Sequence, residues 1–491
     1  MKMKDKKATD FFAAEELAEF IKHAVSPYHT VAEAEKLLKA AGFVRLDAAE
    51  TWRPEAGGRY YTVPYGTVLF AFTIPSQCMK TQHGTDDCMT ARIAGQEGTA
   101  AGSAADSRPG LHIAAAHTDF PCLHVKPKAE LEGRGYMRVN TEIYGGPILN
   151  TWLDRPLSLA GRVMLRSDDI YAPREVLVDF GRPVLTIPNL AVHYNREVNK
   201  GVELTKQNDM LPLLGMLDET LNKDSYFLDM VAEEIGEKKE DILDFDLIVY
   251  NAEEPVFTGL KGDMLSSPRL DNITSCHALV RGITAAGGQA EVHASGLSRN
   301  SSLRKAAEQE TTAVESKCIN LIALFDNEEI GSGTKQGADS ALLRGVLKRI
   351  YAGLGRTDTE LENDIQRGFL LSVDVAHAMH PAKADKYDPV NNMRMGEGVT
   401  FKLSANQRYS YDAVAVAALQ QLCDAHAIRY KKFVNHADMP GGGTLGPIIS
   451  SWLPMLTVDI GVPILAMHSA RELMGAGDQA ELEKLITAFF A

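Results

Sequence analysis

Apolar positions along the first part of the chain follow two different periods. Residues 11–43 place apolar side chains three or four positions apart, with a break at Ser26-Pro27, and this spacing predicts two helices. Residues 60–63 and 67–74 are short apolar runs on either side of Pro64-Tyr65-Gly66, which is the pattern of a β-hairpin. The N-terminal part is therefore expected to contribute two helices followed by two strands.

From residue 268 onward, short apolar runs alternate with stretches of helical period. This alternation predicts an α/β fold with a mainly parallel sheet covered by helices on both faces. Ligands bind at the carboxyl ends of the strands in such sheets, so polar residues that directly follow an apolar run are candidates for chemistry. The expected strands are 111–116, 319–325, 369–373, 400–403, 455–460 and 463–467, and the expected helices are 271–286, 338–352, 411–427 and 478–490.

Residues 125–262 interrupt the alternation. Their β-like runs, such as 160–165 and 244–250, and a longer polar stretch predict an inserted β-rich domain. The insert lacks a dense cluster of metal-binding residue types, so we expect it to serve dimerisation or assembly. The catalytic domain is then discontinuous and comprises residues 1–124 and 263–491.

Composition narrows the class of protein. A chain of 491 residues exceeds one ordinary core. The formal net charge of −14 argues against a nucleic-acid partner. No apolar run reaches the length of a membrane span, and no signal-peptide pattern follows the basic start. Six cysteines without a CxxC motif argue against a disulfide framework, so we expect a cytoplasmic protein. Two polar stretches, 77–110 and 288–317, suggest no function.

Five short motifs carry potential chemistry. The most informative is Asp326-Asn327-Glu328-Glu329, directly after the apolar run 321–325. Adjacent carboxylates at the end of a buried strand are costly unless positive charge compensates them. The other four motifs are His117-Thr118-Asp119, the segment 267–272 with Asp271, the segment 372–380 with Asp374, His377 and His380, and the segment 463–469 with His468.

Each motif alone also fits an ordinary structural role. Asp271 is a good N-cap for the helix that follows it. Glu328 and Glu329 fit a solvated acidic turn, and His468 fits a hydrogen-bonded histidine at a strand end. His377 could be a metal ligand, a substrate contact or a polar loop residue.

The set together predicts a two-metal hydrolase. Two histidines, two aspartates and one glutamate suit Zn²⁺, with Co²⁺ or Mn²⁺ as alternatives. A pair of divalent ions needs one bridging carboxylate, further ligands on each ion and a shared water. Adjacent residues at a strand end point in opposite directions, so we expect one glutamate on a metal and its neighbour facing the water.

On these motifs the chain resembles the aspartyl aminopeptidase family of dinuclear zinc metallo-aminopeptidases, as a bacterial-type member. The resemblance extends from residues 26–32 to residues 466–472 and includes Tyr144-Gly145-Gly146 and the segment 439–447. It implies a zinc-aminopeptidase fold of the phosphorylase/hydrolase-like kind. The roles that it implies are His117 and Asp374 on one metal, Glu329 and His468 on the other, Asp271 bridging, Glu328 as general base, and Asp119 orienting His117.

The resemblance also implies assembly. Residues 187–193 match a segment whose histidine reaches the active site of a neighbouring subunit, so His193 is the candidate for steadying an oxyanion in trans. An exposed loop histidine is the alternative for His193. The family further implies a homo-oligomer based on dimers, up to a dodecamer.

The expected activity is the release of N-terminal residues from peptides through a metal-activated water. A preference for acidic N-termini would place Lys402 opposite an acidic substrate side chain, with His377 as a second substrate contact, although a lysine on a strand is more often solvated. One alternative is a co-catalytic amidohydrolase, a deacylase or carboxypeptidase acting on N-acyl amino acids. The other is a non-catalytic assembly or cargo protein on the same scaffold.

Overall fold

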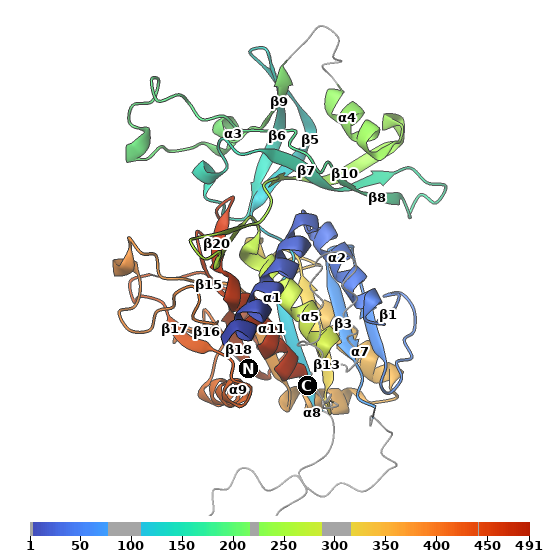
Figure 1. The fold of residues 1–491 in the computed structure, drawn as a ribbon. Coiled ribbons are helices and arrows are strands. Elements are labelled where there is room, and N and C mark those ends of the chain that lie inside the picture. The colour runs from blue at the N-terminus through green and yellow to red at the C-terminus, as the bar shows by residue number, and fades with distance from the viewer. Residues whose placement is uncertain (1–2, 77–109, 217–224, 287–315, 440) are drawn as a thin grey trace, which may run out of the picture.

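The computed structural model describes residues 3–76, 110–216, 225–286, 316–439 and 441–491. The two polar stretches 77–110 and 288–317 therefore fall almost entirely outside the described residues. Figure 1 shows a large body that contains both termini and a smaller body above it. Among the helices described, none has the length and hydrophobicity needed to cross a membrane.

A nine-stranded sheet is the centre of the large body. Its strand order is β1-β2-β3-β13-β4-β14-β18-β16-β17, and the neighbours β13, β4, β14 and β18 run parallel to one another. This arrangement confirms the predicted α/β class. The strands are β1 (Val44–Arg45), β2 (Arg59–Thr62), β3 (Leu69–Thr73), β4 (Leu111–His117), β13 (Ile319–Phe325), β14 (Phe369–Val373), β16 (Val399–Leu403), β17 (Tyr430–Val434) and β18 (Leu456–Gly461).

Helices bury both faces of this sheet, and the sequence of β13 shows how. Ile322 and Leu324 pack into one apolar core, whereas Leu321, Ala323 and Phe325 pack into the other, because successive side chains of a strand point to opposite faces. The helices of the first core are α1 (Met3–His23), α2 (Pro27–Ala40), α5 (Leu270–Ala285), α9 (Ala413–Ala425) and α11 (Ala476–Phe490). Those of the second are α7 (Leu342–Gly353), α8 (Asp358–Gln366) and α10 (Leu445–Trp452).

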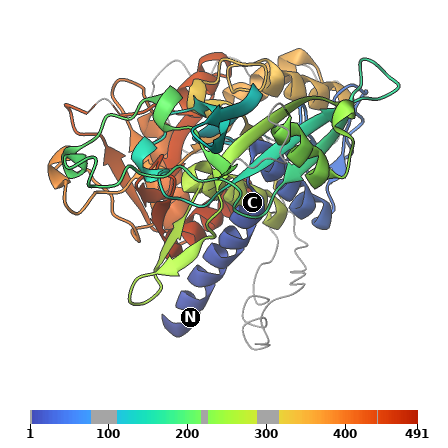
Figure 2. The same ribbon diagram turned by 90° about the horizontal axis from the view of Figure 1, so that it is seen from above.

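The smaller body is built on a six-stranded antiparallel sheet, in the order β8-β7-β10-β5-β6-β9. Seen from above, it lies across the large body (Figure 2). Its first strand begins only five residues after His117, so the chain leaves the nine-stranded sheet beside the first candidate motif. The elements are β5 (Cys122–Gly133), β6 (Tyr136–Tyr144), β7 (Leu157–Leu165), β8 (Arg174–Asp179), β9 (Leu213–Met216), β10 (Ile242–Asn251), α3 (Lys206–Asp209) and α4 (Tyr226–Ile235).

A third, five-stranded sheet in the order β11-β12-β20-β19-β15 connects the exit of the insert to the C-terminal part of the chain. Its pair Ser267↔Glu472 places the start of α5 beside the segment that carries His468. The strands are β11 (Val256–Thr258), β12 (Met264–Ser267), β15 (Ala376–His377), β19 (Pro463–Leu465) and β20 (Glu472–Gly475).

The predicted N-terminal helices and hairpin are confirmed, since β2 and β3 pair antiparallel. The long β5–β6 hairpin was not predicted. Both of its strands alternate buried side chains with exposed, often charged ones, so neither contains the continuous apolar run by which the other strands were predicted. Helix α7 begins at Leu342, four residues later than the apolar pattern predicts.

Gly461 at the end of β18 offers a test of the packing beside the candidate site. A methyl group at this position would lie 1.6 Å from the carbonyl oxygen of Asp374. We expect Gly461→Ala to destabilise the protein by about 1–3 kcal/mol, seen as a lower midpoint of thermal unfolding. The control Gly345→Ala lies in α7, where nothing is within 4 Å, and should raise stability by about 0.5–1 kcal/mol. Equal stability of Gly461→Ala and the wild type would contradict this packing.

Candidate metal centre

Three of the five motifs meet because parallel strands end at one edge of the sheet. The register pairs Phe325 of β13 with His117 of β4, and β14 runs parallel on the other side of β4. His117 therefore lies at the same edge as the segment after β13 and as Asp374, the first residue after β14. All three sites are at the carboxyl ends of their strands, as the alternation predicts.

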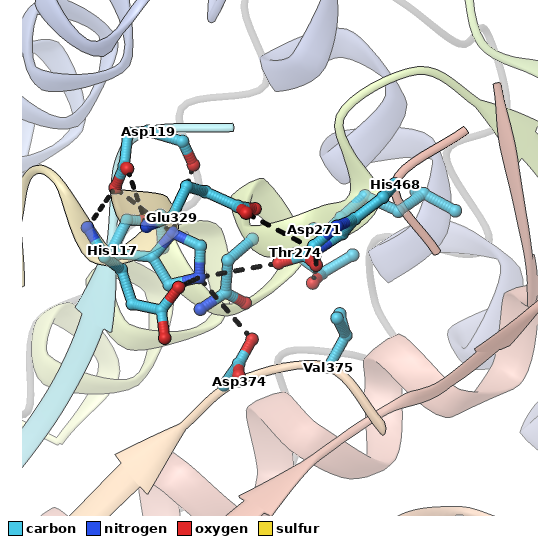
Figure 3. A network of polar contacts seen from close by, with 12 residues as sticks. His117, Asp119, Asp271, Thr274, Glu329, Asp374, Val375 and His468 are labelled. Atoms are coloured by element: carbon cyan, nitrogen blue, oxygen red, sulfur yellow. Dashed lines mark hydrogen bonds and ion pairs between the residues drawn. The ribbon is translucent and has the colours of Figure 1, made fainter. Parts of the chain in front are cut away.

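The two remaining residues come from loops of the five-stranded sheet. Asp271 follows β12 at the start of α5, and its backbone there is not helical. His468 follows β19 with a left-handed φ of 66°. Figure 3 shows the side chains of both residues pointing toward Glu329, His117 and Asp374.

Glu328 and Glu329 do not continue the strand, as the sequence-based picture of opposite-facing neighbours assumed. Asn327 has a left-handed φ of 63°, which ends β13, and Glu328–Ile330 form a 3₁₀ turn. Asp119 stabilises this turn, because its carboxylate accepts the backbone N–H of Glu328 at 3.1 Å and that of Glu329 at 3.1 Å. The two side chains still point to different parts of the site, with Glu329 beside His468 and Glu328 nearer to His117.

The donor atoms form two groups that share Asp271. His117, Asp271 and Asp374 make one group, and Asp271, Glu329 and His468 make the other, each with its atoms within 4.8 Å of one another. Nε2 of His117 lies 3.4 Å from Oδ1 of Asp271, and Nε2 of His468 lies 3.4 Å from Oδ2 of the same residue. One carboxylate therefore faces both groups, one oxygen to each.

Both imidazoles are oriented for metal binding. Nδ1 of His117 donates to the backbone carbonyl of Asp119 at 3.0 Å, and Nδ1 of His468 donates to that of Gly146 at 3.1 Å. A neutral histidine that donates through Nδ1 presents a lone pair at Nε2, which faces the carboxylates here. The side chains thus fit a metal that binds through Nε2.

Three buried carboxylate oxygens support the same fit. Oδ1 of Asp271, Oε1 of Glu329 and Oδ1 of Asp374 have no hydrogen-bond partner in the described part of the chain. Buried acceptors normally have a partner, and divalent cations bind carboxylate oxygens. Imidazole and carboxylate donors in this arrangement suit zinc or a similar ion.

Glu328 stands slightly apart from the two groups. Its Oε2 lies 3.9 Å from Nε2 of His117, and its side chain is 17% exposed, compared with 3% for Glu329. Glu329 instead lies 3.4 Å from Nε2 of His468. Glu329 therefore belongs to a group of candidate metal ligands, whereas the carboxylate of Glu328 lies beside the two groups.

Burial and mutual repulsion shape the charges. Burial raises the pKa of Glu328 to about 8, and burial together with Asp271 raises the pKa of Glu329 well above its ordinary value. Burial alone would lower the pKa of both histidines, but the surrounding carboxylates outweigh it. The pKa of His117 is raised well above its ordinary value, and that of His468 is raised to about 10. Without a bound metal, protons on these side chains therefore supply part of the positive charge that a cation would bring to the site.

Lys402 does not occupy the place that the sequence suggested. It is buried, and its Nζ donates to the carbonyl of Val375 at 3.0 Å and to Oδ2 of Asp374 at 3.3 Å. Burial opposes the charge, but Asp374 and Asp459 raise the pKa of Lys402. The ammonium therefore engages a candidate ligand, which corrects the expectation of a solvent-facing lysine, whereas a contact with an acidic substrate side chain stays a prediction.

The other two candidates lie at different distances from the donors. His377 is half-buried on β15, and burial followed by the charge of Lys402 lowers its pKa. The carboxylates of Asp271 and Asp374 partly oppose this lowering, which shows that His377 lies within electrostatic reach of the donor set. His193 is exposed in a turn of the insert and belongs to neither donor group of its own chain.

Sequence reasoning missed the role of Glu472. This buried carboxylate accepts the backbone N–H of Asp271 at 3.0 Å and that of His468 at 2.9 Å. It thereby holds together two segments that are far apart in sequence. Its position four residues after His468 was the available signal, but only the pairing of β12 with β20 explains the contact.

The family model described as aminopeptidase I zinc metalloprotease (M18) matches residues 20–85 and 98–490. A probable M18 family aminopeptidase 2 from Clostridium novyi is 36% identical over 97% of this chain and 98% of its own. Another from Pseudomonas savastanoi pv. phaseolicola is 35% identical over 97% of each chain. The chain belongs to the M18 aminopeptidase family.

Solved structures agree with the M18 fold. A chain of the cryo-EM structure of the Ape4 and Nbr1 complex is 30% identical, with a TM-score of 0.83 over 100% of this chain and 87% of that one. The M18 aminopeptidase of Thermotoga maritima is 21% identical, with a TM-score of 0.77 over 100% of this chain and 97% of its own. The resemblance inferred from the motifs is thus confirmed, and the protein is a metal-dependent aminopeptidase of the zinc metalloprotease class.

The charges of the M18 site predict that metal binding releases protons. His117 and His468 are protonated near pH 7 without metal, and an imidazole must lose its proton to become a ligand. We expect zinc to release at least about two protons per chain at pH 7, since the raised pKa of Glu329 adds to those of the imidazoles, and its affinity to rise as pH increases from about 6 to 8. Calorimetric titration in buffers of different ionisation enthalpy measures this release. His468→Gln should release one proton fewer, and an absence of net release would contradict the expectation.

Proposed function

We propose that this M18 aminopeptidase holds two divalent ions, with zinc as the expected metal, and releases N-terminal residues from peptides. The sharing of Asp271 between two donor groups carries the proposal, because a bridging carboxylate is what a pair of closely spaced ions requires. His117 and Asp374 would complete one position, and Glu329 and His468 the other.

Bound ions of this kind polarise the scissile carbonyl and make a water more acidic. In this proposal the chain contributes the proton transfer through Glu328. This carboxylate takes a proton from the attacking water and passes it to the leaving amine. In the metal-free site burial raises its pKa to about 8, and a raised pKa makes a carboxylate a better proton acceptor. Asp119 would keep His117 and the Glu328–Glu329 turn in place.

The proposed pair of ions favours a substrate with a free amine. The carboxylates of the donor groups would be occupied by the ions, so a peptide would bind through the lone pair of its free α-amine to an ion held there. A co-catalytic amidohydrolase acting on N-acyl amino acids would need no such free amine. A cargo protein without catalysis would have no use for buried carboxylate oxygens that lack a hydrogen-bond partner in the described part of the chain, because such oxygens cost stability.

Assembly is part of the proposal. The solved yeast relative mApe1 is described as a dodecamer, and we propose a homo-oligomer here, with the insert (predicted at residues 125–262) contributing contacts between subunits. In such an assembly the exposed His193 would reach the site of a neighbouring subunit. The cytoplasmic location likewise stays a prediction from composition.

Replacement of Glu328 by glutamine separates catalysis from metal binding. We expect Glu328→Gln to lower kcat by at least about 10³-fold, because the amide cannot accept the proton of the water. Zinc content, measured by atomic emission, should match the wild type, since Glu328 stands outside the donor groups. Glu55→Gln, an exposed glutamate, is the control and should keep full activity. Retained turnover in Glu328→Gln would refute the assigned role.

A second measurement tests the need for a free amine. We expect free dipeptides to be hydrolysed at least about 100-fold faster than their N-acetylated forms, because the acetyl group removes the amine lone pair by which the substrate would bind to an ion of the site. A panel of Asp, Glu, Leu, Lys and Met aminoacyl substrates, with and without chelator and added Zn²⁺ or Co²⁺, then gives the side-chain preference. Faster hydrolysis of the acetylated forms would favour the amidohydrolase alternative.

A further inference from the structure

The end of strand β6 in the insert reaches the metal centre. The phenol hydroxyl of Tyr144, the last residue of this strand, donates to Oδ2 of Asp119 at 2.7 Å. The same phenol oxygen accepts a hydrogen bond from Nδ2 of Asn327 at 3.0 Å. The half-buried Tyr144 of the six-stranded sheet is thus hydrogen-bonded to Asp119 and Asn327, which follow the ends of β4 and β13 in the nine-stranded sheet.

The Asp119 carboxylate accepts hydrogen bonds from several donors at once, and the Tyr144 hydroxyl is one of those that fix its orientation. Oδ1 lies 3.3 Å from Nδ1 of His117 and accepts the backbone N–H of Glu328, while Oδ2 accepts that of Glu329. Asp119 is 1% exposed, so bulk solvent does not reach its carboxylate. Without the phenol, the carboxylate would have fewer donors and would rotate toward the remaining ones.

The two residues after Tyr144 contact the other half of the site. The carbonyl of Gly146 accepts Nδ1–H of His468, and the backbone N–H of Ile148 donates to the carbonyl of His468 at 2.9 Å. Gly145 has a left-handed φ of 70°, and a methyl group there would lie 3.2 Å from Cβ of Glu329. This segment between β6 and β7 therefore lies against the donor group that contains Glu329 and His468.

We propose that Tyr144 is a positioning residue through which the inserted sheet holds Asp119, and through Asp119 holds His117 and the Glu328–Glu329 turn. The proposal rests on the function assigned above to His117 and Glu328. Burial followed by the charge of Asp119 raises the pKa of the Tyr144 phenol, so it remains a hydrogen-bond donor at all working pH values. Tyr144 touches neither donor group directly, so its effect must pass through Asp119.

The test is Tyr144→Phe in the full chain, which removes only the hydroxyl. Partners that orient metal ligands are typically worth 10–100-fold in metal affinity or activity. We expect kcat to fall about 10- to 100-fold with KM changed less than about twofold, and the Kd of the apoprotein for zinc to rise about tenfold. Zinc affinity is measured by competition with a chromophoric chelator, which requires no turnover.

Tyr226→Phe is the matched control. Tyr226 lies in the same insert, and its hydroxyl also joins two strands, since it donates to the carbonyl of Arg138 at 2.7 Å and accepts the backbone N–H of Leu131 at 3.2 Å. Its loss should lower the midpoint of thermal unfolding and leave kcat and zinc affinity at wild-type values. If Tyr144→Phe behaves in the same way as this control, Tyr144 is merely structural and the proposal is wrong.

A double-mutant cycle decides whether the effect passes through Asp119. Asp119→Ala alone and Asp119→Ala with Tyr144→Phe should have the same kcat and zinc affinity, because Asp119→Ala already removes the acceptor of the phenol hydroxyl. Additive losses would overturn the proposal. The outcome is distinguishable from a failure of the proposed function, since an active Glu328→Gln would refute the general base and leave the zinc affinities of these variants unaffected.

Discussion

The burial of several carboxylates in one small region is the constraint on which the rest of this structure depends. Asp119, Asp271, Glu329 and Asp374 are buried or nearly buried within one small region. Burying ionised carboxylates without compensation is costly, and breaking such a cluster is more costly still. Two imidazoles, the ammonium of Lys402 and backbone N–H groups compensate part of the charge, and the oxygens without partners leave a place for cations.

The topology explains why these carboxylates lie together. Parallel strands end at one edge of a sheet, so β4, β13 and β14 deliver His117, the Glu328–Glu329 turn and Asp374 to neighbouring positions. The five-stranded sheet adds Asp271 and His468 from the side, with Glu472 bonded to the backbone of both. Ligands from five separate segments make the site a property of the whole fold, so metal binding must also stabilise that fold.

The sequence predicted the elements whose burial is uniform, and it predicted the donors as residue types at strand ends. Strand β13 was predicted at its full length because helices cover both faces, so all seven residues are buried and six of them are apolar. The β5–β6 hairpin was not, since its strands alternate buried and exposed positions and contain no continuous apolar run. The contacts of Tyr144, Lys402 and Glu472 depend on how distant segments dock, and no local pattern encodes such contacts. The turn at Glu328 was missed because Asn327 leaves the strand through a left-handed conformation.

His117 and His468 each donate a hydrogen bond to the main chain, and this type of acceptor does not change when the nearby carboxylates gain or lose protons. Each Nδ1 donates to a backbone carbonyl, one from Asp119 and one from Gly146. A carbonyl oxygen is not protonated at any pH at which the protein is folded, whereas the nearby carboxylates change charge with pH and with bound cations. A side-chain acceptor would release the imidazole whenever it took up a proton. Carbonyl acceptors keep each Nε2 directed at the shared Asp271 in both charge states of the site, and for His117 the Asp119 carboxylate, 3.3 Å from the same Nδ1, adds a side-chain restraint.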